Sequence, residues 1–100
     1  MDADEQMDDW PFDQAPNVAA ITLRTVLDGE PILYVTHDDD GGWQFLDGAE
    51  HELDDAAVIG MGTALRLDPT LREIADLPMG WVATRGGPGE PWRREPHPET

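Results

Sequence analysis

The sequence predicts a small α+β domain, and two patterns lead to this expectation. Short apolar runs rich in β-branched and aromatic residues are separated by clusters of Asp, Gly and Pro, which is typical of strands joined by turns. Before the last of these runs, two segments space their apolar residues as short helices do. A chain of 100 residues supports one core and no second domain. We therefore expect an antiparallel sheet of about four strands with two or three short helices on one face.

The clearest strand is the run ILYVTH at 32–37, which alternates between two faces and which we expect to be central. Three Asp and two Gly residues follow it and tolerate the backbone of a tight turn. They lead into a second alternating run, WQFL, at 43–46. Residues 32–46 are therefore predicted as a β-hairpin, and the runs at 56–61 and 81–84 as the third and fourth strands.

Three helical segments are predicted. An apolar run at 18–22 precedes a helical turn at 23–29, with Thr22 as its N-cap and Gly29 at its end. Residues 63–67 and 70–77 form two further short helices, separated by Asp68-Pro69 at a position where proline suits a first turn. Leu71 and Ile74 give the second of these its apolar stripe.

Both ends of the chain differ from this body in composition. Residues 1–16 are acidic and contain two prolines, so they are predicted as a flexible arm. Residues 86–100 are rich in Pro and Gly and are predicted as a flexible tail, which leaves 17–85 as the folded domain. The arm has two large side chains, Trp10 and Phe12. They either dock on the protein's own surface, which we favour, or serve as a short partner-binding motif.

Charge restricts the class of partner. The chain has 22 acidic and 6 basic residues and a net charge of −16. This charge repels phosphate backbones and anionic lipid surfaces, so we expect neither nucleic acid nor membrane as a partner. A basic protein is the natural complement of this charge. Acidity also keeps a small protein soluble, and the composition favours neither explanation over the other.

The sequence contains no Cys, Lys or Ser. Disulfides, thiolate metal clusters and Cys-His catalysis are therefore excluded. No apolar run approaches the length of a membrane span and the start of the chain is acidic, so we expect a cytoplasmic protein.

One cluster has the residue types of a cation site: His37 and Asp38–Asp40, followed later by Asp47, Glu50 and His51. Three consecutive Asp residues cannot all face one ion, and their spacing does not fit a calcium loop. We interpret the cluster as a solvated turn and expect no metal and no cofactor. No nucleophile or base stands in a catalytic motif, so the chain is predicted not to be an enzyme.

A surface for a basic partner would combine acidic residues, which steer the encounter, with a few aromatic residues, which supply affinity. The candidates are Asp38, Asp39, Asp40, Asp47, Glu50, Glu52, Asp54, Asp55, Trp10 and Phe12.

Three segments resemble a known family: GWQFLDGAE at 42–50, Leu67-Asp68-Pro69, and Leu77-Pro78-Met79-Gly80. Over residues 18–85 the chain resembles the DUF2185 family, the Imm33-like immunity proteins. The resemblance implies a bacterial cytoplasmic α+β domain that neutralises a toxin by binding it, with no catalytic residues to carry over. We therefore expect a non-catalytic protein-binding domain, with toxin immunity as its specific form. The alternatives are a regulatory or structural subunit of a bacterial complex and a small metal-dependent enzyme.

Overall fold

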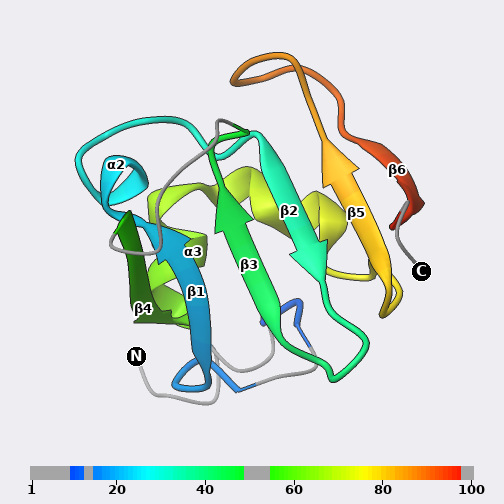
Figure 1. The fold of residues 1–100 in the computed structure, drawn as a ribbon, viewed down its shortest axis with the longest axis horizontal. Coiled ribbons are helices and arrows are strands. Elements are labelled where there is room, and N and C mark those ends of the chain that lie inside the picture. Colours follow the sequence, from blue (N-terminus) through cyan, green and yellow to red (C-terminus); the bar gives the residue numbers. More distant parts are fainter. Residues whose placement is uncertain (1–9, 13–14, 49–54, 98–100) are drawn as a thin grey trace.

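A computed structural model describes residues 10–12, 15–48 and 55–97, which form a six-stranded mixed sheet with short helices (Figure 1). The strands are β1 (Ala19–Leu23), β2 (Tyr34–His37), β3 (Trp43–Leu46), β4 (Ala56–Gly60), β5 (Trp81–Thr84) and β6 (Arg93–Pro96). Their order is β4-β1-β3-β2-β5-β6. The α+β class is confirmed, whereas the expected four-stranded antiparallel sheet is wrong in strand number and in the direction of one strand pair.

The predicted hairpin is present, with β2 and β3 paired antiparallel from Tyr34 opposite Leu46 to His37 opposite Trp43. Gly41 adopts a φ of 92° in the turn, a conformation that glycine reaches without steric cost. The Asp38 amide closes the turn by donating to the Gly42 carbonyl at 2.7 Å. β2 lies between β3 and β5, so its predicted central position is confirmed.

β1 and β3 form the parallel pair, with Ile21 beside Gln44 and Thr22 beside Phe45. β1 and β2 are not neighbours in the sheet, because β3 lies between them. β1 and β2 run in opposite directions, so β3, which is antiparallel to β2, is parallel to β1. The Thr22 hydroxyl donates to the Phe45 carbonyl at 2.7 Å across this pair. Thr22 is therefore not the predicted helix cap, and α2 (Arg24–Leu27) begins after Leu23 without a side-chain cap.

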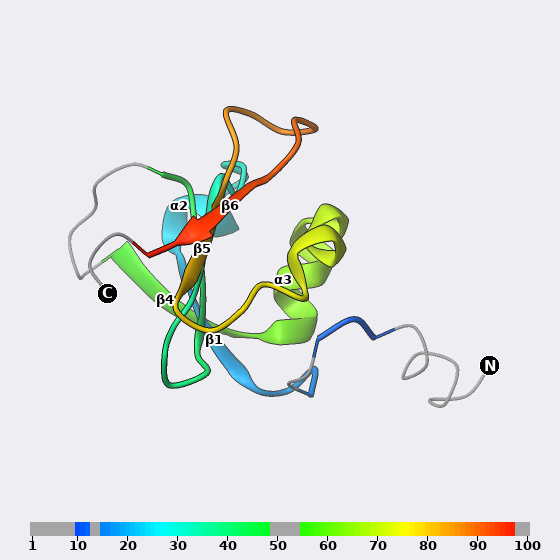
Figure 2. The ribbon, with the colours of Figure 1, turned by 90° about the vertical axis from the view of Figure 1, so that its right-hand side faces the viewer.

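α3 (Met61–Leu67) and η2 (Pro69–Ile74) lie against one face of the sheet (Figure 2). η2 is a 3₁₀ helix and ends earlier than the short helix predicted at 70–77. Asp68 caps it by accepting a hydrogen bond from the Thr70 amide. The predicted stripe is present in that Leu71 and Ile74 are fully buried.

The core lies between the sheet and these helices. It is built mainly from Ala20, Val35, Trp43, Phe45 and Ala83 of the strands, and Met61, Ala64, Leu71 and Ile74 of α3 and η2. Ile21 of β1 alternates with buried Ala20 and Thr22 and so lies on the opposite side, which we call the open face.

β6 is formed by residues that were predicted to lie in a flexible tail. It pairs antiparallel with β5, from Thr84 opposite Arg93 to Trp81 opposite Pro96. Arg94 reaches from β6 to the η2 region, where its guanidinium donates to the Glu73 carbonyl and lies 2.7 Å from an Asp76 carboxylate oxygen. Pro and Gly in this segment therefore mark a turn and an edge strand, and the prediction for residues 86–97 is wrong.

Candidate functional site

The acidic candidates do not form one cluster among the described residues. Asp38, Asp39 and Asp40 occupy the β2–β3 turn, before β3, whereas Asp47 follows the other end of that strand. Four residues of β3 separate them, a length of about 13 Å. Asp55 directly precedes β4, at the Asp47 end, because Ala56 pairs with Leu23. Glu50, Glu52 and Asp54 lie outside the described residues.

Most of the described Asp side chains bind the protein's own groups. The Asp38 carboxylate accepts hydrogen bonds from the Thr36 hydroxyl at 3.1 Å and from the side-chain amide of Gln44 at 3.0 Å. Asp40 accepts one from the Gly42 amide at 3.0 Å, and Asp39 is exposed. Among the described residues, no three His, Asp or Glu side chains are grouped as metal ligands would be. Asp38 is thus held by hydrogen bonds within the hairpin, and Asp39 and Asp40 are exposed.

Asp47 ties two elements together. It accepts a hydrogen bond at 2.9 Å from the hydroxyl of Thr25, which lies in α2. This contact fixes α2 at the end of β3, so the side chain has a structural role at this position.

The two aromatic residues of the arm lie on the protein itself. Phe12 is only 5% exposed, and its ring meets Trp43 edge-on with centroids 5.1 Å apart. Trp10 lies 5.5 Å from Phe12 and is partly buried against the core. Both Trp10 and Phe12 therefore dock on the protein's own surface, as we predicted. Phe12 must be removed from the partner-binding candidates, because a side chain in the core presents no surface to a partner.

His37 is part of the core lining rather than an exposed ligand. Its ring stacks on Trp43 at a centroid distance of 4.1 Å. Nδ1 lies 2.7 Å from the Leu77 carbonyl, and since a carbonyl only accepts, Nδ1 carries the proton. His37 thus joins the end of β2 to the loop that follows η2.

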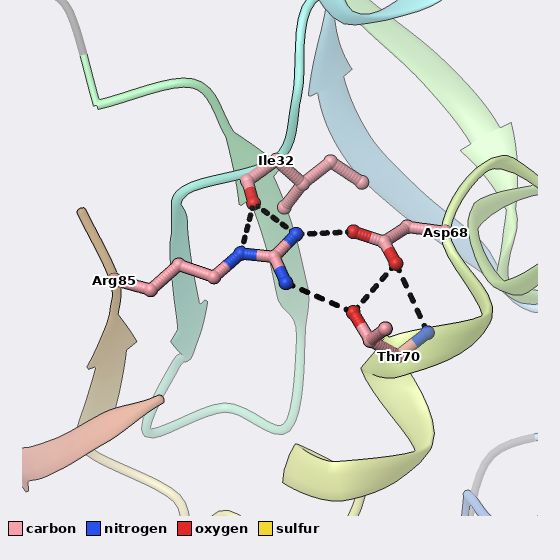
Figure 3. Close-up of polar contacts among 4 residues, drawn as sticks. All are labelled: Ile32, Asp68, Thr70 and Arg85. Carbon is pink, nitrogen blue, oxygen red and sulfur yellow. Dashed lines mark hydrogen bonds and ion pairs between the residues drawn. The ribbon is translucent and has the colours of Figure 1, made fainter. Parts of the chain in front are cut away.

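The most connected polar group in the described structure is one that the sequence did not single out, Arg85, directly after β5 (Figure 3). Its Nε and Nη2 donate to the Ile32 carbonyl at 3.1 and 2.9 Å. Nη2 also binds the Asp68 carboxylate at 2.5 Å, and Nη1 donates to the Thr70 hydroxyl at 3.0 Å. The Arg85 side chain is 2% exposed and that of Asp68 16%.

The network around Arg85 closes on itself. The Thr70 hydroxyl donates to the second carboxylate oxygen of Asp68 at 2.6 Å, and the Thr70 amide donates to the same oxygen. Both carboxylate oxygens are thus occupied, and the charge of Arg85 is balanced by Asp68. We call Asp68, Thr70, Arg85 and the Ile32 carbonyl the arginine latch. It joins β5, the start of η2 and the segment before β2.

Trp92 covers the latch from the β6 side, with the guanidinium carbon of Arg85 4.2 Å from the centre of its ring. A buried cation over an indole face gains about 2 kcal/mol or more when desolvated. The sequence signal for part of this group was the Asp-Pro-Thr segment, which is typical of a capped helix start. No local pattern identifies the arginine that binds the cap from seventeen residues away along the chain.

A cavity of about 470 Å³ lies beside the latch. Its walls are largely apolar and include Leu27, Ile32, Leu67 and Pro88, with Glu30 as a further charged residue. The latch has already used the carboxylate of Asp68 and the hydroxyl of Thr70, so the cavity offers a ligand mainly apolar contact. The Thr70 hydroxyl and the Asp68 carboxylate lie in its wall as a hydrogen-bonded pair, and both are also bound to Arg85.

An exposed apolar surface lies on the other side of the sheet. Val58 of β4 stands opposite Ile21 of β1, and the two side chains are 68% and 37% exposed. Ala56, at the start of β4, is also exposed. β4 itself is an edge strand, which pairs with β1 and with no other strand of the described chain.

No protein-family model, curated protein or solved structure matches this chain. Within the described residues, no helix is long and apolar enough to span a membrane.

Proposed function

We propose that this chain is a non-catalytic protein-binding domain that takes a basic protein partner on the open face of its sheet. The observation that supports it is the exposed pair Ile21 and Val58 in a chain whose net charge is −16. Protein interfaces commonly combine an apolar centre, which supplies affinity, with complementary charge around it, which accelerates the encounter. A basic partner with an apolar patch satisfies both requirements.

Toxin immunity is the specific form of this function that we propose. The resemblance of residues 18–85 to the DUF2185 family gives the partner a class, a bacterial toxin, and inhibition by binding needs no catalytic group. The exposed Asp39 and Asp40 at the hairpin turn would act on the rate of association through their charge. In this role the domain covers a basic surface of the toxin.

Affinity capture from the protein's own lysate tests this function, with washes at low and high salt. We expect one basic protein to be retained at low salt and released at high salt, since exposed charge pairs are screened. Val58→Asp should reduce the capture. Met79→Asp should leave it unchanged, because Met79 is 58% exposed but precedes β5, beyond β1, β3 and β2. An empty capture, or one that is indifferent to Val58→Asp, contradicts the proposal.

The immunity role has a further readout. Expression of the captured protein alone should stop bacterial growth, and co-expression of this chain should restore it. A captured assembly that is harmless, of fixed stoichiometry and stable at high salt would instead identify a structural or regulatory subunit.

A further inference from the structure

The two edges of the sheet differ in how they are protected. β6 carries Arg93, Arg94, Glu95 and Pro96, all exposed. Charged residues and proline on an edge strand oppose the addition of another strand. β4 has the sequence AAVIG, with no charge and no proline, and its central Val58 is 68% exposed. β4 is therefore the described edge that lacks these protective residues.

Within the described residues, no strand pairs with the outer side of β4. Its five residues pair with β1, from Ala56 opposite Leu23 to Gly60 opposite Ala19. An edge strand directs the N–H and C=O groups of alternate residues away from the sheet, where they match the groups of an added strand. Five residues offer a ladder of about 17 Å, enough for one short strand.

We infer that the partner adds an extended segment to β4, as a seventh strand of the sheet. This inference rests on the proposed function and specifies how the partner binds. In an added strand, every second side chain would lie on the open face beside Val58 of β4, with Ile21 one strand further into the sheet. Val58 then forms the specificity contact, while backbone hydrogen bonds to β4 supply the rest of the affinity.

The charge of the chain indicates which kind of segment pairs with β4. Two copies of this chain each carry −16, so pairing of β4 with β4 of a second copy is opposed by repulsion. In the sequence, five of the nine residues at 47–55, which lead into β4, are acidic. The segment that suits this edge is therefore extended, apolar on the side facing Val58, and rich in Lys or Arg.

The probe for the test is a capped peptide of roughly seven residues with alternating lysine and valine, long enough to cover β4. Binding to the full-length chain is measured by titration, and the exchange of individual backbone amides by NMR. The matched control peptides are N-methylated at every second amide, in each of the two registers. They keep charge and side chains, but one of them lacks the donors that an added strand needs.

We expect the unmodified peptide to bind and to slow amide exchange in β4. One N-methylated register should bind at least tenfold more weakly. Val58→Lys should weaken binding by a similar factor, and Met79→Lys, which adds the same charge elsewhere, should not. Val58 is mostly exposed, so its replacement leaves the core intact, which a thermal unfolding curve verifies.

Equal binding of all three peptides, without protection of β4 amides, would overturn strand addition. It would leave the proposed function standing, since attraction between a basic peptide and an acidic protein would remain. Failure of the unmodified peptide to bind at low salt also overturns strand addition. The proposed function is decided separately by the capture experiment.

Discussion

Replacing Asp68 by alanine should destabilise the domain strongly. The change removes the carboxylate that balances Arg85, whose side chain is 2% exposed. Breaking a buried ion pair by removing one partner costs about 3–5 kcal/mol, because the remaining charge is left buried. Asp68 keeps 16% exposure, so we take the lower end of that range. Loss of the cap on η2 adds about 1 kcal/mol.

The expected total for Asp68→Ala is about 4 kcal/mol, against the roughly 5–15 kcal/mol by which small domains are usually stable. Urea unfolding followed by tryptophan fluorescence measures it. With a slope of about 1–2 kcal/mol per molar urea, the midpoint should fall by roughly 2–4 M. The matched control is Asp76→Ala, which removes the carboxylate that pairs with Arg94. The Asp76 side chain is 81% exposed, so its loss should cost under about 1 kcal/mol.

A double variant distinguishes the cost of leaving the Arg85 charge buried and unpaired from the cost of losing its contacts with Asp68. Arg85→Met combined with Asp68→Ala removes both charges and fills part of the space with an apolar side chain. We expect it to be more stable than Asp68→Ala alone, because no buried charge remains unpaired. If Asp68→Ala costs no more than Asp76→Ala, or if the double variant is no more stable than Asp68→Ala alone, the reasoning about the latch is refuted.

Three further predictions concern other contacts. Phe12→Ala should lower the free energy of unfolding by about 3–4 kcal/mol, measured in urea, because the ring is in the core; a cost below about 1 kcal/mol would contradict this placement. Trp92→Ala should cost about 2 kcal/mol and speed amide exchange in β6, whereas Trp92→Phe keeps a ring over Arg85 and should cost less. Changing Asp39 and Asp40 together to asparagine should slow association with a captured basic partner severalfold and flatten its salt dependence, without lowering stability.

Elements that depend on neighbouring residues could be predicted from the sequence. The hairpin and β5 follow from period-two alternation and from turn residues between the runs. The parallel pairing of β1 with β3 could not be predicted, because it depends on which of two compatible strands inserts beside β1, and no local pattern records that choice. β6 was missed because Pro and Gly suggest irregular structure, although both are compatible with a turn followed by an exposed edge strand.

The site was predicted less well than the fold, for a physical reason. Acidic residues that are close in sequence were grouped, but β3 carries Asp47 away from the turn at Asp38–Asp40. The latch and the open face depend on contacts between distant segments. Arg85 and Asp68 meet only after η2 packs on the sheet, and Val58 is exposed because it lies on the open face beside Ile21.

The charges of this chain divide into two groups with opposite effects on stability. Asp68 and Arg85 neutralise each other in a buried site, so removing either charge alone should strongly destabilise the protein. The exposed acids contribute to a net charge of −16 that repels itself, so neutralising one of them should leave stability unchanged or raise it slightly. A loss of partner binding in Asp39→Asn and Asp40→Asn, with the unfolding midpoint maintained, can therefore be assigned to the surface. The same loss of binding in Asp68→Ala cannot be assigned to the surface, because this change also destabilises the fold.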